Sequence, residues 1–159
     1  MSNPGKDLIL SWDDVHRASK ALARKLHSEG SWKGIMCITR GGLIPAGIIS
    51  RELGLRLIDT ICIHSYDHQS QGEASVLKKP EVEDGGKEWL VIDDLSDTGN
   101  TLRIVREIYP ESHFACLYSK PEGAGFVDTW IQDVPQDTWI HFPWDLSLQY
   151  TAPIAGEEG

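Results

Sequence analysis

Short apolar runs alternate with helical segments along this 159-residue chain. The runs "GIMCIT", "LIDTICIHSY", "EWLVID" and "HFACLYSK" predict strands, and the continuous apolar run "GIMCIT" is typical of a strand buried on both faces of a sheet. Apolar residues at helical spacing predict helices at 11–29, 43–53 and 101–109 between these runs. Such alternation favours right-handed crossovers, so we expect an α/β fold with a mostly parallel central sheet flanked by helices. The length fits a single domain over residues 1–159.

The composition excludes several classes of protein. The net charge is −9, which argues against nucleic-acid binding, because that requires Lys and Arg to neutralise phosphates. A transmembrane helix needs about 20 mostly apolar residues, and no such run occurs. The N-terminus lacks a basic stretch followed by an apolar core, so we expect a cytoplasmic protein. Cys37, Cys62 and Cys116 lie in apolar runs without metal-ligand spacing, and we interpret them as buried free thiols.

Polar residues follow three of the predicted strands. They are Arg40–Gly42, Asp93–Asp94 and Ser119–Lys120. Ligands of open parallel sheets bind beyond the carboxyl ends of the strands. We therefore expect the functional site at these three strand ends.

The stretch "VIDDLSDTGNT" at residues 91–101 has the properties of a phosphate site without a lysine. Asp93 and Asp94 are expected at the strand exit, and Gly99 allows backbone angles that other residues avoid. The following helix N-terminus would attract an anion through its free N–H groups. Carboxylates beside such a cradle suit sugar hydroxyls or Mg²⁺, which favours a phosphorylated sugar as ligand. A plain helix cap at Asp97 or Thr98 after an acidic turn would also account for the spacing.

This stretch resembles the phosphoribosyl-pyrophosphate (PRPP) motif of type I phosphoribosyltransferases. The segments "WKGIMCITRGGLIPAGIISRELG", "DTICIHSYDH", "SKPEG" and "VPQDTWIHFPWD" extend the resemblance to the bacterial xanthine-guanine branch of that family. The resemblance implies the type I fold, with a flexible loop at about 67–87 and a small base-binding hood at about 121–150. It also implies a purine-salvage enzyme that uses PRPP and Mg²⁺. The bases would be guanine, xanthine and, less well, hypoxanthine, and the products GMP, XMP, IMP and pyrophosphate.

The resemblance assigns PRPP-binding roles to two loops. Arg40 and Gly41 would hold the pyrophosphate, and the Arg40–Gly41 peptide would be cis. Asp93 and Asp94 would hold the ribose hydroxyls, with Asp94 on Mg²⁺ directly or through water. The 5′-phosphate loop comprises Asp97, Thr98, Gly99, Asn100 and Thr101.

The resemblance also assigns the purine site. Asp97 would be the catalytic residue, which accepts the proton of purine N7. Lys120 would bind the 6-oxo group, Trp139 would stack on the base, and Ile140 would present backbone groups to the 2-position.

Some features of the resemblance leave alternatives open. Relatives often carry an arginine in the flexible loop, but residues 67–87 contain none, so Lys78 or Lys79 would supply the positive charge. The resemblance implies a homotetramer in the cytoplasm, with peripheral attachment to the inner membrane as an open alternative. Two other functions stay open: a phosphoribosyltransferase that prefers hypoxanthine, and a regulator that senses PRPP or nucleotides without catalysis.

Overall fold

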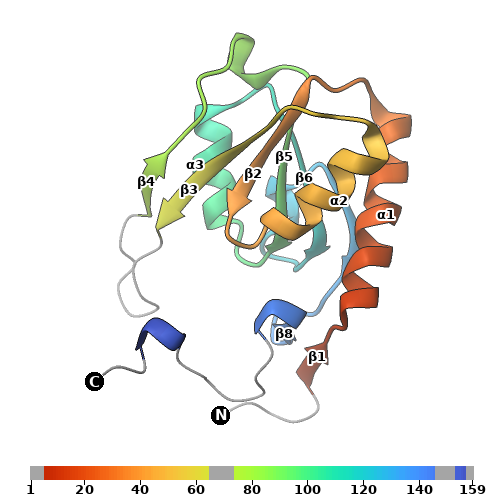
Figure 1. The fold of residues 1–159 in the computed structure, drawn as a ribbon. Helices are drawn as coiled ribbons and strands as arrows, with labels where there is room; N and C mark the ends of the chain where they lie inside the picture. Colours follow the sequence, from red (N-terminus) through yellow and green to blue (C-terminus); the bar gives the residue numbers. More distant parts are fainter. Residues whose placement is uncertain (1–5, 65–73, 146–152, 157–159) are drawn as a thin grey trace.

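A computed structural model describes residues 6–64, 74–145 and 153–156 as a central sheet with helices on both faces (Figure 1). The strands of the sheet are β2 Gly34–Thr39, β3 Ile58–His64, β4 Ser75–Lys78, β5 Trp89–Ser96, β6 His113–Ser119 and β7 Thr129–Asp133. They lie in the order β4-β3-β2-β5-β6-β7, and all neighbours pair in parallel except β4 with β3. This confirms the predicted α/β fold with a mostly parallel sheet.

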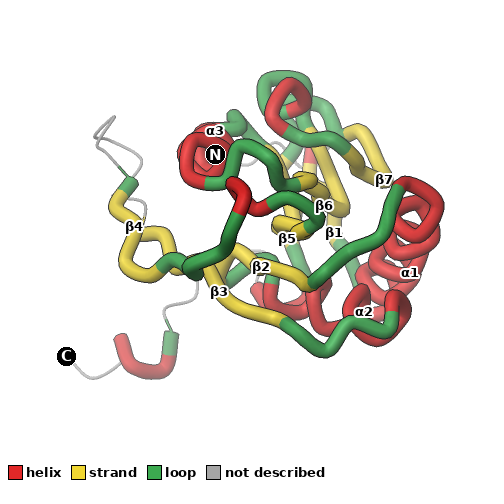
Figure 2. Tube along the Cα trace, turned by 90° about the horizontal axis from the view of Figure 1, so that it is seen from above, coloured by secondary structure: helices red, strands yellow, loops and turns green. Residues whose placement is uncertain are grey.

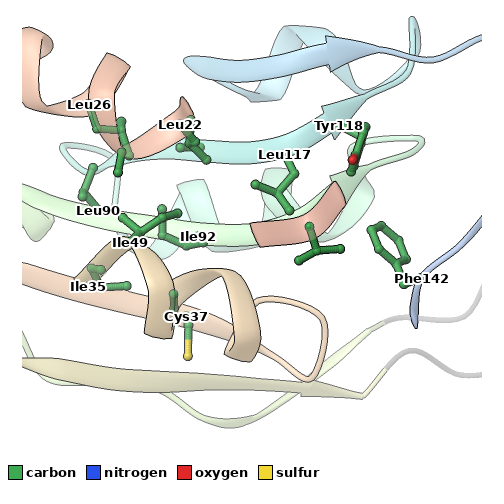
Figure 3. Close-up of a cluster of buried hydrophobic side chains, with 14 of the residues drawn as sticks. Leu22, Leu26, Ile35, Cys37, Ile49, Leu90, Ile92, Leu117, Tyr118 and Phe142 are labelled. Atoms are coloured by element: carbon green, nitrogen blue, oxygen red, sulfur yellow. The ribbon is translucent and has the colours of Figure 1, made fainter. Parts of the chain in front are cut away.

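The continuous apolar runs have a direct structural reason. Side chains of a strand alternate between the two faces of the sheet, and here each face is covered. In β2, Ile35 and Cys37 pack in one cluster with helices α1 (Trp12–Glu29) and α2 (Leu43–Leu53), as Figure 3 shows. Met36 and Ile38 belong to the second cluster, which includes residues of α3 (Asn100–Ile108). A strand between two such layers needs apolar residues at every position.

The helix ends follow local signals in the sequence. Ser11 caps α1: its hydroxyl accepts from the Asp14 N–H at 3.0 Å, and its own N–H donates to the Asp14 carboxylate at 2.9 Å. Helix α2 ends at Gly54, whose φ of 67° lies in the left-handed region. The predicted bounds of α2 match the structure, those of α1 differ by one residue at the start, and those of α3 differ by one residue at each end. None of the helices in the described part of the chain is long and apolar enough to span a membrane.

Strand β5 continues three residues beyond its predicted end at residue 93. Leu95 pairs with Tyr118 of β6, and Ser96 pairs with Ser119, so the ladder extends past the acidic pair. Asp93 and Asp94 therefore lie inside the strand rather than at its exit. The apolar pattern stops at Ile92. The strand was therefore predicted to end too early, because the prediction used the polarity of the residues alone.

Further strands lie within the predicted flexible loop and near the C-terminus. Within the predicted loop, β4 pairs with β3 as the edge strand of the sheet, and it lies at one end of the sheet in Figure 2. Residues 65–73 lie outside the described residues. Near the C-terminus, β8 (Trp139–His141) pairs in parallel with β1 (Asp7–Ile9) to form a second, two-stranded sheet. Both of these strands have only three residues, too few for a periodic signal.

Candidate active site

A pocket of about 530 Å³ opens at the carboxyl ends of the central strands. Its lining joins the Arg40–Gly41 loop after β2, the acidic pair of β5 and Thr101 of α3. The segment after β8 closes another side through Trp144 and Asp145. Of the predicted PRPP-binding residues, the pocket is lined by Arg40, Gly41, Asp93, Asp94 and Thr101, and it is not lined by Asp97, Thr98, Gly99 or Asn100.

The acidic pair carries strong electrostatic repulsion. Asp93 is only 9% exposed, and burial, followed by the charge of Asp94, raises its pKa well above the ordinary range. Burial also raises the pKa of Asp94, and the nearby charge of Asp145 adds to this effect. Asp93 is thus buried within β5, where solvent does little to offset its charge.

The loop after β2 packs directly on the acidic pair. A Cβ atom on Gly41 would lie 2.6 Å from the carboxylate oxygens of Asp94, and one on Gly42 would lie 2.4 Å from the carbonyl oxygen of Ile92. Both positions therefore require glycine. The cis peptide is Thr39–Arg40, one residue before the predicted Arg40–Gly41 bond. Arg40 is exposed and lines the pocket.

The phosphate loop leads into α3 through a left-handed glycine. Gly99 is the residue that precedes the helix, with φ of 83°, so the capping position lies neither at Asp97 nor at Thr98. The Thr98 hydroxyl accepts a bond from the Asn100 N–H at 3.4 Å, and Gly99 makes no side-chain cap. The first helical turn therefore presents backbone N–H groups that can bind an anion. Asn100 is exposed, and Thr101 is half-buried at the pocket.

Asp97 and Lys120 are brought together by strand register. Ser96 pairs with Ser119, so the next residue of each strand lies opposite the other. Lys120 Nζ is 3.3 Å from Asp97 Oδ2, and the lysine side chain is 6% exposed against 51% for the aspartate. The Lys120 N–H also donates to the Ser96 carbonyl at 2.9 Å, which fixes the start of the turn.

A third side chain, Gln136, completes this cluster. Its Nε2 donates to Asp97 Oδ1 at 2.8 Å, and its Oε1 accepts from the Glu122 N–H at 3.0 Å. Gln136 was not among the predicted site residues, because a glutamine in a loop carries no chemical signal by itself.

Trp139 and Ile140 lie on β8, next to this cluster in sequence but outside the lining of the 530 Å³ pocket. Trp139 is 61% exposed, and Ile140 is buried against the α1 and α2 face of the core. The exposed indole is available to a planar ligand. The buried isoleucine anchors the strand that carries it.

Two assignments change with the structure. Lys78 Nζ donates to Asp59 Oδ1 at 2.5 Å and to Thr60 Oγ1 at 3.0 Å, so its charge is held at the sheet edge. Lys78 and Lys79 are both exposed, and Lys79 does not take part in this ion pair. Cys37 and Cys116 are buried as predicted, but Cys62 is only half-buried because β3 lies next to the short edge strand.

The acidic pair fits Mg²⁺ by donor type and charge. Mg²⁺ prefers oxygen ligands and is usually held by one or two carboxylates together with substrate phosphates. Among the residues that the structure describes, no group of three or more His, Cys, Asp or Glu side chains is arranged to hold a metal. Asp93 and Asp94 would therefore supply part of the coordination, and a cation there would relieve their repulsion.

Comparison with known proteins decides the family of this site. The model of the phosphoribosyl transferase domain matches residues 7–151. The chain belongs to the phosphoribosyltransferase family. Xanthine-guanine phosphoribosyltransferase of Desulfotalea psychrophila is 53% identical over 150 residues, which cover 94% of this chain and 92% of the relative. The resemblance predicted from sequence, including its xanthine-guanine branch, is confirmed.

Solved phosphoribosyltransferase structures share the fold. A purine phosphoribosyltransferase from Pyrococcus horikoshii has a TM-score of 0.76 and 30% identity, covering 92% of this chain and 99% of that one. The xanthine-guanine-hypoxanthine phosphoribosyltransferase of Helicobacter pylori has a TM-score of 0.74 and 26% identity, and the match covers 88% of this chain and 94% of that one. The type I phosphoribosyltransferase fold is therefore confirmed by sequence and by structure.

Proposed function

We propose that this phosphoribosyltransferase transfers the 5-phosphoribosyl group of PRPP to guanine, xanthine and, less well, hypoxanthine in purine salvage. The observation that carries the proposal is the Lys120–Asp97 pair, with donor and acceptor 3.3 Å apart. A 6-oxopurine presents the complementary edge: its 6-oxo group accepts, and its N7–H donates. Adenine presents a 6-amino donor to Lys120 instead, which would leave a buried charge unpaired.

The pocket and the loop that leads into α3 would supply the groups that bind PRPP. Arg40 and the Gly41 backbone would bind the pyrophosphate. The N–H groups at the start of α3, with the hydroxyls of Thr98 and Thr101, would bind the 5′-phosphate. Asp93 and Asp94 would accept bonds from the ribose hydroxyls. Asp94 would help to hold Mg²⁺, which would supply positive charge to stabilise the departing pyrophosphate.

In the proposed reaction, the bond between ribose C1′ and pyrophosphate breaks and a bond from a purine ring nitrogen forms. Asp97 accepts the N7 proton, which makes the attacking nitrogen of the base more nucleophilic. Lys120 stabilises the negative charge that develops on the 6-oxo oxygen, and Arg40 stabilises that on the leaving pyrophosphate. No covalent intermediate with the protein is needed.

The hood strand would orient the base. Trp139 is exposed on β8 and would stack on the purine ring, while Ile140 would hold the 2-substituent through its backbone. We also expect a homotetramer. Light scattering on the purified protein measures its mass, and a monomeric mass would contradict this expectation.

Initial rates of pyrophosphate release with guanine, xanthine and hypoxanthine test the proposal. Guanine and xanthine should both be used, with hypoxanthine slower. A xanthine rate at background with rapid hypoxanthine turnover would favour the hypoxanthine-preferring alternative. Binding of PRPP without pyrophosphate release from any of the three bases would favour the regulator.

A further inference from the structure

The side chain of Gln136 links three parts of the purine site. It lies on the connection between β7 and β8, three residues before Trp139. Its Nε2 donates to Asp97 Oδ1 at 2.8 Å and to the Asp97 carbonyl at 3.4 Å. Its Oε1 accepts from the Glu122 N–H at 3.0 Å, in the turn after Lys120. The bond to an N–H group defines which amide atom is the oxygen, so the NH₂ group must face Asp97.

We propose that Gln136 is the positioning residue that holds the Asp97 carboxylate in the orientation needed to accept the purine proton. This inference rests on the proposed function, in which Asp97 is the proton acceptor. Asp97 follows the last residue of β5, and its side chain is 51% exposed, so packing does not fix its rotamer. Two hydrogen bonds fix it instead: Lys120 at Oδ2 and Gln136 at Oδ1.

The two bonds differ in what happens when the base binds. Lys120 is also the donor for the 6-oxo group, so its bond to Asp97 weakens as the purine enters. Gln136 has no such second task, because its other end is tied to the Glu122 backbone. It therefore remains the donor that orients Asp97 during proton transfer. Correct placement of a general base within hydrogen-bond reach is a condition for its action.

The amide chemistry of the residue matters as well as its shape. A glutamine donates to the carboxylate without competing for the purine proton. A glutamate of the same shape would place a second carboxylate against Asp97 Oδ1 and leave Lys120 as the one neighbouring positive charge in the cluster. Two carboxylates in contact share a proton, so the pair would ionise at higher pH than Asp97 alone.

The test compares Gln136→Ala, Gln136→Glu and the control Gln132→Ala. Gln132 is exposed on β7, so its truncation leaves the purine site intact. We expect Gln136→Ala to lower kcat with guanine about tenfold, the loss typical of one hydrogen bond to a charged group, with the KM for PRPP unchanged. We expect Gln136→Glu to move the acid limb of the kcat profile about one pH unit upward. Gln132→Ala should match the wild type in both respects.

The Asp97→Asn background separates positioning from a structural role. If Gln136 acts through Asp97, Gln136→Ala costs little further kcat when Asp97 is already replaced by asparagine. An equal tenfold loss in both backgrounds, or a Gln136→Glu profile with an unmoved acid limb, would overturn the inference. Thermal unfolding of each variant controls for folding, and Gln136→Glu keeps the shape if Gln136→Ala is unstable.

Failure of the inference can be told from failure of the proposed function. If the wild type releases no pyrophosphate, or if Asp97→Asn turns over like the wild type, the proposed function is wrong. If the wild type is active and Asp97→Asn is impaired, but Gln136→Ala keeps wild-type kcat, only the role of Gln136 is wrong.

Discussion

Lys120 Nζ and Asp97 Oδ2 lie 3.3 Å apart, at the ends of two neighbouring parallel strands. The lysine side chain is 6% exposed, and a buried ammonium is stable when it is paired. The aspartate stabilises it in this structure, and a 6-oxopurine that binds between them would take over that task. A buried charge that must be paired by the substrate gives a strong basis for discrimination among bases.

Replacing Asp97 by asparagine tests the proton acceptor. The substituted amide keeps the shape and can still accept from Gln136, but it cannot take the purine proton. We expect kcat to fall by about 10²- to 10⁴-fold, while PRPP affinity measured by calorimetry changes little. Equal losses in turnover and PRPP affinity would show that Asp97 binds PRPP and has no separate role as base.

Replacing Trp139 by alanine tests the stacking role. The side chain is 61% exposed, so its loss should leave the melting temperature almost unchanged. Stacking of a base on an aromatic ring contributes about 1–3 kcal/mol, so the KM for guanine should rise by about fivefold or more. Trp12, which is 52% exposed on α1, gives a matched control as Trp12→Ala. Similar guanine KM values in both variants would contradict the assignment.

Replacing Gly99 by alanine tests the geometry of the phosphate loop. The added Cβ would lie 2.2 Å from the Phe126 ring, at a φ of 83°. We expect the KM for PRPP to rise at least about tenfold and stability to fall by about 1 kcal/mol or more, because backbone and ring cannot both stay in place. Gly47→Ala is the control: it lies in α2, and its Cβ would meet nothing within 4 Å. That substitution should stabilise the protein by roughly 0.5–1 kcal/mol.

Replacing Asp93 by asparagine tests the electrostatic repulsion in the acidic pair. The pKa of Asp93 is raised above 3.8 in the folded protein, so the folded state binds the proton more tightly than the unfolded state. This group's contribution to stability is thus full below pH 3.8 and is lost as pH rises through the folded pKa. Without Mg²⁺ at pH 7, Asp93→Asn should raise the melting temperature by about 3 °C, with activity lost.

The gain in melting temperature should shrink as the pH is lowered toward the ordinary aspartate range. Glu83→Gln, at an exposed acid, serves as control and should leave the melting temperature nearly unchanged at every pH. A lower melting temperature for Asp93→Asn at pH 7 would mean that the ionised carboxylate stabilises the fold.

Much of the fold could be predicted, because the hydrophobic pattern and the residues at helix ends indicate the same helices and strands. The helix Leu43–Leu53 and the apolar strand Gly34–Thr39 lie where the sequence predicted them. The end of β5 was missed, because pairing with β6 continues through the polar residues after Ile92. Strands β1 and β8 were missed because each consists of three residues held mainly by the other.

Some parts of the candidate site could likewise be predicted from the sequence, and others could not. "VIDDLSDTGNT" and "RGG" could be assigned from their own chemistry and from a family resemblance. The contact between Asp97 and Lys120 depends on strand register, and the contact between Gln136 and Asp97 depends on the path of a loop. Neither contact could be derived from the spacing of residues in the sequence. The burial of Asp93 could not be derived either, because it depends on β5 continuing between its neighbouring strands beyond this residue.

The most direct measurement compares guanine with 2,6-diaminopurine, which has a 6-amino group in place of the 6-oxo group and therefore also lacks the N1 proton. For the wild type, we expect kcat/KM with PRPP and Mg²⁺ to favour guanine by about 10³-fold or more, because the 6-amino group leaves Lys120 unpaired. In Lys120→Met the preference should fall toward unity, while Lys87→Met, at an exposed lysine, should keep it. Equal rates for the two bases in the wild type would contradict the account of this site.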